Sequence, residues 1–290
     1  MKQKTFNELM KERFGGKVYR LALTTGCSCP GRDRGMPCIF CSAEGSGDFA
    51  APASLSVSGQ IEYTKKLVAG KLSGNFAGYM AYFQSFTNTY GPVERLRDIF
   101  LEAANHPEIL AVSIATRPDC LPEEMVEMLS EVSAVKPLTV ELGLQTANEK
   151  TAEFLKRGYK NEVFEDAVRR LKKKGIEVVV HLIVGLPGET AKDCLAAAEY
   201  LSGLPVDGVK LQVLQVLSGT KLAELTKGDP SLVPRISLEE YTDIVKQMLE
   251  VLPETVTVHR LTGDPPKKLL ISPLWTADKK KVLNYMKKEL

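Results

Sequence analysis

Apolar runs alternate with amphipathic segments along this chain of 290 residues. Runs rich in apolar and β-branched residues predict strands, and apolar residues between them recur at helical spacing. The run at 176–184 is almost entirely apolar, which is typical of a strand buried on both faces of a parallel sheet. The predicted strands cover 18–25, 78–84, 109–115, 138–145, 176–184 and 206–216, and helices are expected over 58–72, from Pro92, over 122–132, within 146–174 and over 190–201.

Six strand–helix repeats without a strong hairpin signal predict an α/β fold with a parallel sheet covered by helices. A doubly wound sheet and a partial barrel both satisfy this order. Polar or special residues follow nearly every predicted strand, and active-site residues of barrels gather at the carboxyl ends of the strands. We therefore expect a partial (β/α)6 TIM-like barrel over 1–230, with a C-terminal extension over 231–290. The residues after the strands are the cysteines of the first loop, Gln84, Arg117, Asp119, Gln145, the segment 185–189, Gln215 and Ser218.

The composition, 44% hydrophobic and 26% charged, is typical of a globular protein. No apolar run is long enough to span a bilayer, and the first residues lack the apolar core of a signal peptide. We therefore expect a cytoplasmic protein with no membrane partner. In that compartment, clustered thiols are more often metal ligands than disulfides.

Charge is distributed unevenly along the chain, although the net charge is only +2. From residue 259 to the C-terminus, eight Lys and Arg residues stand against three acidic ones, whereas the first 258 residues carry 30 basic and 33 acidic residues. A basic tail on a mildly acidic body suggests an anionic partner. A solvated, lysine-rich terminal helix gives the same pattern, and charge alone favours that simpler explanation.

Three cysteines follow the first predicted strand: Cys29 and the C-x-x-C pair Cys38 and Cys41. Thiolates in this spacing can surround one soft metal centre. Iron–sulfur clusters usually take four thiolates, so three would leave one iron open to a substrate or cofactor. Cys27 is also present, and four thiolates could instead form a closed structural zinc site. This stretch alone does not decide between zinc and a cluster.

Motifs from the first strand almost to the C-terminus resemble the radical S-adenosylmethionine (SAM) superfamily. The chain looks most like the bacterial branch related to the catalytic subunit of Elongator. Two positions depart from the family pattern: Gly31 stands where asparagine is expected after Cys-Pro, and Cys27 adds a thiol. The matching stretches are Cys29-Pro30 with Arg32-Asp33, CIFCS at 38–42, GSGDF at 45–49, YFQ at 82–84, TNTY at 87–90, TRPD at 116–119, ELGLQT at 141–146, GLPGE at 185–189 and HRLTGD at 259–264.

The resemblance implies a [4Fe-4S] cluster held by Cys29, Cys38 and Cys41, because the family's first ligand is the cysteine that precedes proline. Cys27 is then a bystander. The open iron of such a cluster binds SAM, and one-electron reduction of the bound SAM yields a 5′-deoxyadenosyl radical. The cluster and SAM are thus the expected cofactors.

The resemblance also implies contacts around SAM. Phe40 is expected near the adenine, Gln84 at the methionine amino group, Gln145 at the ribose and Arg157 at the carboxylate. A glycine-rich turn between strand and helix allows the backbone to approach a ligand closely, although such a turn is more often only a tight connection. We include Gly185, Leu186 and Pro187 of this turn among the cofactor-binding residues.

Proteins related to this branch act on the C5 side chain of wobble uridine in tRNA. The resemblance implies conversion of carboxymethylaminomethyl-uridine to aminomethyl-uridine, with tRNA and a one-electron donor such as flavodoxin or ferredoxin as partners. The basic tail, with Lys279, Lys280 and Lys281, fits contact with phosphates. Trp275 and Tyr285 could stack on bases or anchor the tail to the barrel.

Two other functions stay open. One is a radical SAM enzyme that acts on a peptide or a small metabolite. The other is a non-catalytic RNA-binding protein stabilised by zinc.

Overall fold

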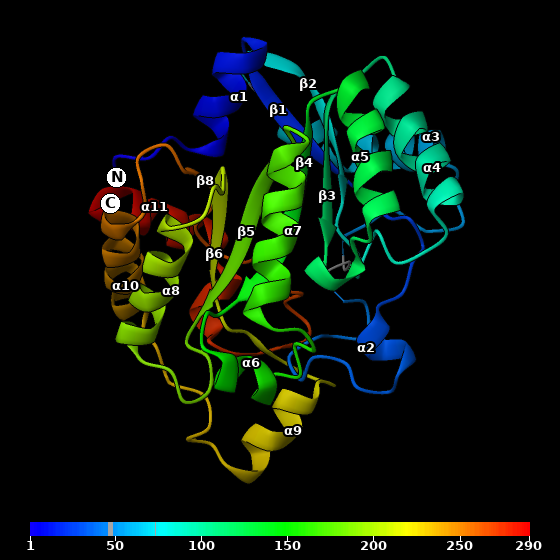
Figure 1. Cartoon of the computed structure of the whole chain (residues 1–290). Coiled ribbons are helices and arrows are strands. Elements are labelled where there is room, and N and C mark those ends of the chain that lie inside the picture. Colours follow the sequence, from blue (N-terminus) through cyan, green and yellow to red (C-terminus); the bar gives the residue numbers. More distant parts are fainter. Residues whose placement is uncertain (46–48, 73) are drawn as a thin grey trace.

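Seven parallel strands form the central sheet of the computed structural model, which describes residues 1–45, 49–72 and 74–290. The strands are hydrogen-bonded in the order β1-β2-β3-β4-β5-β6-β8, and the sheet curls into a half-barrel (Figure 1). The expected α/β partial barrel is therefore confirmed. The strand bounds are Lys17–Leu23 (β1), Phe76–Phe83 (β2), Ile109–Thr116 (β3), Leu138–Gln145 (β4), Glu177–Val184 (β5), Gly208–Val213 (β6) and Thr257–Arg260 (β8).

The seventh strand, β8, is one that the hydrophobic pattern does not predict. It lies within the extension expected at 231–290 and pairs with β6, so this part of the chain contributes to the barrel. The run expected at 206–216 is divided between β6 and the short strand β7 (Val216–Leu217). β7 pairs antiparallel with β9 (Leu270–Ser272) outside the main sheet. Of the GSGDF stretch, residues 46–48 lie outside the described residues.

Amphipathic helices cover the outer face of the half-barrel (Figure 1). In α7, the buried residues Phe164, Ala167, Val168 and Leu171 recur at spacings of three and four, so one stripe of the helix faces the sheet. The helix bounds are Phe6–Phe14 (α1), Pro30–Asp33 (α2), Val57–Val68 (α3), Val93–Asn105 (α4), Glu123–Val135 (α5), Glu149–Phe154 (α6), Asn161–Lys173 (α7), Ala191–Ser202 (α8), Lys221–Gly228 (α9), Leu238–Val251 (α10) and Lys279–Glu289 (α11), with 3-10 turns at Ala69–Lys71, Pro118–Cys120 and Leu274–Ala277.

The N-terminal helix α1 packs against both edge strands of the sheet, β1 and β8. Phe6 and Met10 on α1 are buried in a cluster with Val18, Met80 and Ala111. Val18 and Ala111 lie near the amino ends of β1 and β3, and Met80 lies in the middle of β2 and pairs with Ala111. The amino end of the half-barrel is therefore filled by an apolar plug.

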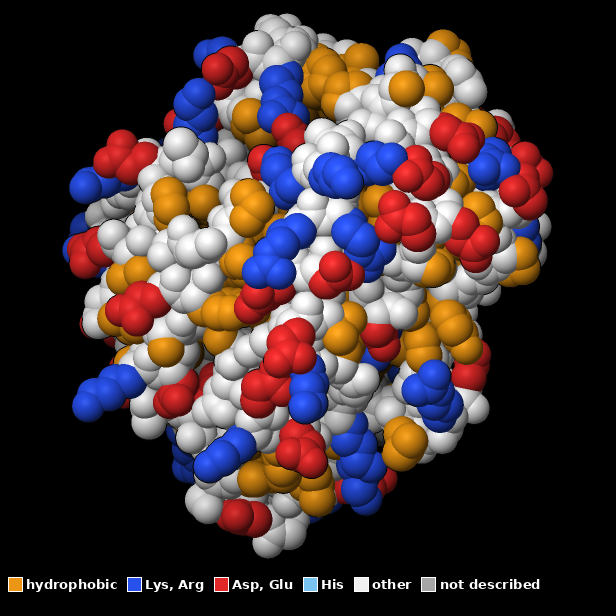
Figure 2. Space-filling model, in the orientation of Figure 1, with side chains coloured by type: hydrophobic (Ala, Val, Ile, Leu, Met, Phe, Trp, Pro, Cys, Tyr) orange, Lys and Arg blue, Asp and Glu red, His pale blue; other side chains and the backbone are white. Residues whose placement is uncertain are grey.

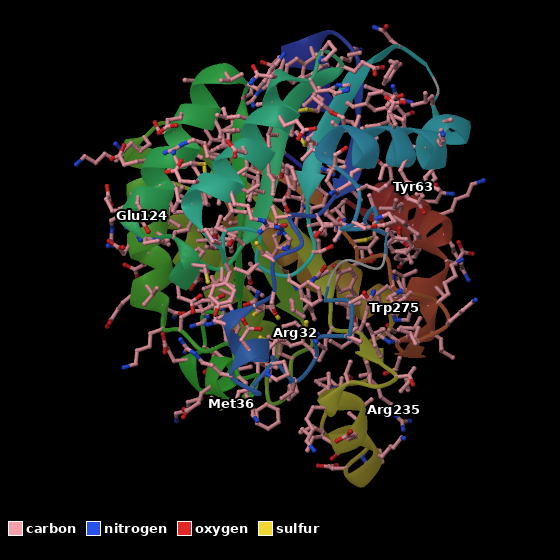
Figure 3. The ribbon with its side chains drawn as sticks, turned by 90° about the vertical axis from the view of Figure 1, so that its right-hand side faces the viewer. Arg32, Met36, Tyr63, Glu124, Arg235 and Trp275 are labelled. Carbon is pink, nitrogen blue, oxygen red and sulfur yellow. The ribbon has the colours of Figure 1, made fainter. Side chains whose placement is uncertain are left out.

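The C-terminal helix α11 packs against α10 and buries Val282 and Met286. Upstream of it, Trp275 donates from Nε1 to the carbonyl oxygen of Ile236 at 2.9 Å, and its ring centroid lies 5.5 Å from that of Tyr241 (Figure 3). Trp275 therefore anchors the C-terminal segment, which is one of the two roles expected for it. Among the described residues, no helix combines the length and the apolar composition needed to cross a membrane.

Candidate active site

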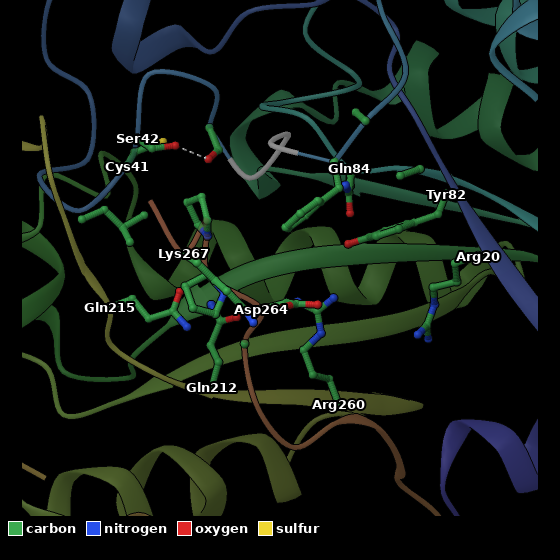
Figure 4. A pocket seen from close by; sticks show the side chains of 18 of the residues that line it. Arg20, Cys41, Ser42, Tyr82, Gln84, Gln212, Gln215, Arg260, Asp264 and Lys267 are labelled. Carbon is green, nitrogen blue, oxygen red and sulfur yellow. Dashed lines mark hydrogen bonds between the residues drawn. The ribbon is translucent and has the colours of Figure 1, made fainter. Parts of the chain in front are cut away.

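A cavity of about 690 Å³ opens between the two sides of the half-barrel. Phe40, Cys41 and Gln84, three residues singled out from the sequence, line its wall. Figure 4 shows Cys41 and Gln84 among the residues around the cavity. Side chains from both edge strands also line it: Arg20 from β1 and Arg260 from β8. Other lining residues come from α3 and the 3-10 turn after it, from β6 and the residues that follow it, and from the segment after β8, among them Tyr63, Lys71, Gln212, Gln215, Asp264 and Lys267.

The cysteine-bearing loop is fixed to the neighbouring strands by hydrogen bonds of Asn88. The backbone nitrogen and Oγ1 of Thr25 donate to Asn88 Oδ1 at 3.3 and 3.0 Å, and Asn88 Nδ2 donates to the carbonyl oxygen of Ala115 at 2.9 Å. Within the loop, Ser28 Oγ donates to Asp33 Oδ1 at 2.7 Å. These contacts give the TNTY motif a structural role, because it holds the start of the loop against the end of β3.

The three expected cluster ligands lie on this loop in different local settings. Cys29 is the N-cap residue of α2 and carries no side-chain capping bond. The Cys38 thiol lies 3.5 Å from the carbonyl oxygen of Lys156, and burial raises the pKa of this thiol to about 12. The guanidinium of Arg32 donates to Cys41 Sγ at 3.5 Å. Metal coordination deprotonates a bound thiol, so a buried neutral thiol is compatible with a ligand role.

Cys27 points elsewhere. It is 8% exposed, belongs to the main hydrophobic core, and accepts from Arg95 Nη1 at 3.5 Å. It does not line the cavity. This position supports the assignment of Cys27 as a bystander.

The spacing of the thiols also bears on the zinc alternative. In a tetrahedral site with Zn–S bonds of about 2.3 Å, the sulfur atoms lie about 3.8 Å apart. Among the described residues, the cysteine sulfurs form no set of three within 4.8 Å of one another; the group that meets this limit is Glu62, His106 and Glu108, on the surface. Lys65 bonds to both carboxylates of that group, which accounts for its closeness. The described cysteine sulfurs are therefore not gathered at the spacing of a single tetrahedral zinc ion.

The remaining predicted SAM contacts fall into two groups. Phe40 and Gln84 line the cavity beside Cys41, whereas Gln145 and the 185–187 turn do not. Gln145 has a φ of 63°, which is uncommon for a residue with a side chain and clusters at functional sites, and its Oε1 accepts from Tyr159 at 3.4 Å. Gly185 has a φ of 83°, and a Cβ there would lie 2.7 Å from Ile236, so the turn requires glycine. Leu186 is fully buried.

The side chain of Arg157 forms hydrogen bonds within the protein. Its side chain is 2% exposed, and Nη1 donates to the carbonyl oxygens of Leu144 and Thr146 at 3.0 Å each. Nε donates to the carbonyl oxygen of Tyr159 at 3.0 Å, and Nη2 to Asn161 Oδ1 at 2.9 Å. These bonds fix the connection between β4 and α7. A contact of Arg157 with the SAM carboxylate stays a prediction.

A buried polar network inside the half-barrel was not anticipated from the sequence. Glu141 on β4 forms an ion pair with Lys210 on β6. The same carboxylate accepts from Ser113 Oγ at 2.8 Å and from Tyr82 at 3.1 Å, and lies 2.8 Å from His181 Nε2. All five side chains face inward from β2–β6. The signal for this network was present in the ELGLQT stretch, where a glutamate interrupts an apolar strand.

Opposing effects set the ionisation of this network. Burial opposes ionisation of Glu141, but Lys210, His181 and Arg20 hold the pKa of its carboxyl well below the usual range. Burial lowers the pKa of His181, and burial with the nearby Arg20 holds the pKa of His259 well below its usual value. Both imidazoles are therefore neutral near pH 7, and Glu141 remains the anion to which His181 donates.

Two arginines complete the inner wall. Arg20 lies with its Cζ 3.5 Å from the ring centroid of Phe6 and its Nη2 3.5 Å from His259 Nδ1. A bulge shifts the pairing of β6 with β8, so that Lys210 pairs with Arg260. His259 covers Gly208, where a Cβ would lie 2.8 Å from the imidazole, and Arg260 lines the cavity. The bulge thus brings two successive side chains of β8 to the inner face.

The basic tail reaches the rim of the cavity through one contact. Lys279 forms an ion pair of 2.8 Å with Asp264, which lines the cavity. Lys267 lines the cavity itself, while Lys280 and Lys281 are exposed. In contrast to the lysine-rich start of α11, acidic and basic side chains are interspersed on the face shown in Figure 2.

Comparisons with known proteins agree with this architecture. The Radical SAM superfamily model matches residues 23–201, and the Radical_SAM C-terminal domain model matches 206–290. The chain is 39% identical over 289 residues to the uncharacterized protein YtqA of Bacillus subtilis, with 99% of this chain and 88% of YtqA covered. It is also 31% identical over 173 residues to a tRNA uridine(34) acetyltransferase of Methanocaldococcus jannaschii, with 59% of this chain and 31% of that protein covered.

Solved structures share the fold. The archaeal Elp3 of Methanocaldococcus infernus superposes with a TM-score of 0.66 at 20% identity, covering 94% of this chain and 63% of that one. Methylornithine synthase superposes with a TM-score of 0.55 at 14% identity, covering 98% and 85%. With a cysteine loop after β1, a half-barrel and a matching C-terminal region, the chain belongs to the radical SAM superfamily, whose cofactors are a [4Fe-4S] cluster and SAM.

Proposed function

We propose that this radical SAM enzyme modifies the C5 side chain of wobble uridine in tRNA and converts carboxymethylaminomethyl-uridine to aminomethyl-uridine. The similarity to a tRNA uridine(34) acetyltransferase over 59% of the chain carries this proposal. That protein's name refers to the wobble position, and the proposal extends the same substrate position to this chain. The narrower choice of reaction follows the resemblance of the motifs to the branch described above.

The cavity suits an extruded nucleotide. Ligand cavities usually measure about 300–1,000 Å³, and the cavity of about 690 Å³ lies within that range. Enzymes that act on a base take it out of the stack, and anticodon loops present bases that can be splayed out. Phe49 and Tyr63, which are 53% and 41% exposed, lie among the cavity residues and offer aromatic faces to a base.

Cys29, Cys38 and Cys41 would hold the cluster, and Phe40 and Gln84 would contact SAM on the same wall. Removal of the carboxymethyl group is a two-electron oxidation, in which water enters, the N–CH₂ bond breaks, the amine stays on uridine and the two carbons leave as glyoxylate; SAM and the cluster supply the acceptors for the hydrogen atom and the second electron. The protein's part is to position the substrate carbon and to exclude bulk water. A flavodoxin or ferredoxin would reduce the cluster to its active state at the outset, because the electron spent on SAM would be returned to the cluster by the substrate in each turnover.

Mass spectrometry of tRNA nucleosides tests this function. A strain that lacks the protein should accumulate carboxymethylaminomethyl-uridine and lose aminomethyl-uridine and its derivatives. The wild-type gene should restore the profile, whereas a Cys41→Ala gene should not. An unchanged nucleoside profile, together with undetectable tRNA binding by the purified protein, would instead favour a peptide or a small metabolite as substrate.

A further inference from the structure

We propose that Arg260, with Arg20 on the opposite edge strand, forms a binding site for the carboxylate of the substrate's modified side chain. This inference rests on the proposed function and names the group through which the enzyme recognises its substrate. The site lies at the inner end of the cavity and is assembled from β1 and β8.

The inner end of the cavity carries positive charge without a matching carboxylate. Glu141 and Lys210 pair with each other and together add no net charge. Arg20 and Arg260 are two further cations, and neither forms a salt bridge with a carboxylate among the described residues, although Arg20 lies close enough to Glu141 to lower the pKa of that carboxyl. Arg20 Nε is buried and makes no hydrogen bond to any described residue. Lys210, Arg20 and Arg260 are thus three cations around the single carboxylate of Glu141, and because an excess of buried positive charge is costly, this arrangement favours binding of an anion.

Arg260 has its guanidinium available. Other arginines near the site are already engaged: Arg95 with the Thr25 carbonyl oxygen, Arg117 with the Asp119 carboxylate, and Arg157 with several acceptors. No hydrogen bond or ion pair joins the side chain of Arg260 to any of the described residues, although this side chain is half-buried and lines the cavity. A guanidinium fork in this state can accept a carboxylate with two parallel hydrogen bonds.

The position of the two arginines fits a substrate side chain rather than the cofactor. Figure 4 shows Cys41 and Ser42 on one side of the cavity and Arg20 on the other, with Gln84, Tyr82 and Arg260 between them. A carboxylate held by Arg260 and Arg20 would leave the methylene carbon beside it directed back toward the cysteine loop. The carboxylate of SAM, bound at the cluster, would lie at the other end.

RNA phosphates are a poorer match for this inner site. A flipped nucleotide enters a pocket with its base first, while its phosphates stay at the mouth. The carboxymethylaminomethyl group extends from C5 of the base and ends in the carboxylate. The deepest cations of the cavity therefore face the substrate's carboxylate, and phosphate contacts fall to cations at the rim such as Lys267.

Binding of two anticodon stem-loops tests the site. The two RNAs are identical except that one carries carboxymethylaminomethyl-uridine and the other aminomethyl-uridine at the wobble position. Affinities are measured under anaerobic conditions with reconstituted holoenzyme and SAM but without reductant, so that no turnover occurs. Because the phosphates are the same in both RNAs, the ratio of the two affinities reports the carboxymethyl group, and the change of this ratio in an Arg260 variant reports the contact with its carboxylate.

The wild type should bind the carboxylate-bearing RNA about tenfold to a hundredfold more tightly, as expected for a charge-assisted bidentate contact. Arg260→Gln should bring the ratio close to one, and Arg260→Lys should retain part of the preference. Iron content and SAM affinity of both variants should equal those of the wild type. Arg235→Gln, which removes a charge from the exposed connection between α9 and α10 (Figure 3), should keep the full preference.

Two failures are distinguishable. If the wild type converts the carboxylate-bearing RNA but shows no preference between the two stem-loops, or if folded Arg260→Gln keeps the preference, the carboxylate site is wrong and the proposed function stands. If the wild type neither binds nor converts either RNA, the proposed function fails, and the inference fails with it.

Discussion

The Glu141 carboxylate and the Lys210 ammonium form an ion pair at the centre of the half-barrel, with side chains that are 1% and 0% exposed. The pair joins β4 to β6 across the inward-facing His181 of β5. Below it, toward the amino ends of the strands, lies the apolar cluster around Phe6 and Met10; above it lies the cavity. The pair therefore lies at the boundary between the apolar plug at the amino end of the half-barrel and the cavity of the candidate active site.

Breaking this pair should destabilise the fold. Burial and the neighbouring arginines already hold the pKa of Lys210 well below its usual value, and the Glu141 carboxylate is the group that opposes this shift. Glu141→Gln removes that counter-charge, and removal of one partner of a buried pair typically costs about 3–5 kcal/mol of unfolding free energy. Urea denaturation of the variant should show a loss of that size. The double variant Glu141→Leu/Lys210→Met removes both charges and should recover most of the stability. A single variant as stable as the wild type would contradict this account of the pair.

Acid should weaken the same contact. Because the folded protein holds the pKa of Glu141 well below the unfolded value of about 4.3, its ionisation stabilises the fold above that pH. This contribution falls away as the pH drops through the folded pKa. Between pH 5 and pH 3, the wild type should therefore lose more unfolding free energy than the Glu141→Leu/Lys210→Met variant. Urea denaturation of both proteins at each pH measures these losses. Equal losses in the two proteins would contradict this role of Glu141.

Iron content should separate the cysteines of the first loop. Cys29→Ala, Cys38→Ala and Cys41→Ala should each lose the brown colour and most of the iron after anaerobic reconstitution. Cys27→Ala should keep both, because Cys27 packs in the hydrophobic core against Arg95 and not along the cavity. A colourless Cys27→Ala protein that is otherwise folded would overturn this ligand assignment.

The hydrophobic pattern predicts the parts of the fold whose stability comes from apolar burial. The run that forms β5 is nearly all apolar, and the helical spacing in α7 matches the stripe that faces the sheet. β8 escapes the pattern because two of its four residues are inward-facing polar side chains: His259 contacts Phe6 and Arg20, and Arg260 lines the cavity. Their inward position depends on a bulge opposite β6, a tertiary feature that the local sequence does not encode.

The candidate site is predictable to a similar degree. The cysteine motif and Gln84 follow from local spacing and from the ends of strands, and the structure brings Cys41 and Gln84 to one cavity. Arg157 does not follow in this way, because its acceptors are carbonyl oxygens whose directions only the folded chain defines. Lys210 would be expected at the surface from its type alone, and only the carboxylate of Glu141, far away in sequence, explains its burial.

Gln84 and Arg157 should therefore respond differently to alanine substitution. Gln84→Ala removes a cavity side chain and should weaken SAM binding while iron content and melting temperature stay the same. Arg157→Ala removes hydrogen bonds to several buried acceptors and should lower the melting temperature, in addition to any change in SAM affinity. Calorimetric titration of SAM and thermal melts of both holoenzyme variants check this. Normal SAM affinity of Gln84→Ala would exclude it from the cofactor site.

The lysines at the start of α11 should contribute to RNA binding. Lys279 is joined to Asp264 at the cavity rim, so its neighbours Lys280 and Lys281 project from a segment beside the proposed entrance of the anticodon loop. Each phosphate contact that is lost reduces the slope of log affinity against log salt by about 0.7–0.9. Lys280→Glu/Lys281→Glu should therefore weaken tRNA binding steeply at low salt. Because two contacts are lost, the slope of log affinity against log salt should fall by about one to two. Iron content and cleavage of SAM in the absence of RNA should not change.

A matched charge reversal separates a local contact from a general electrostatic effect. Lys11 and Lys173 are exposed on α1 and α7, outside the cavity, and form no ion pair with described residues. The variant Lys11→Glu/Lys173→Glu changes the net charge by the same amount and should bind tRNA nearly as the wild type does. If the two double variants lose affinity equally, the attraction comes from net charge. If Lys280→Glu/Lys281→Glu binds tRNA like the wild type at physiological salt, α11 is a solvated helix and the RNA docks on another surface.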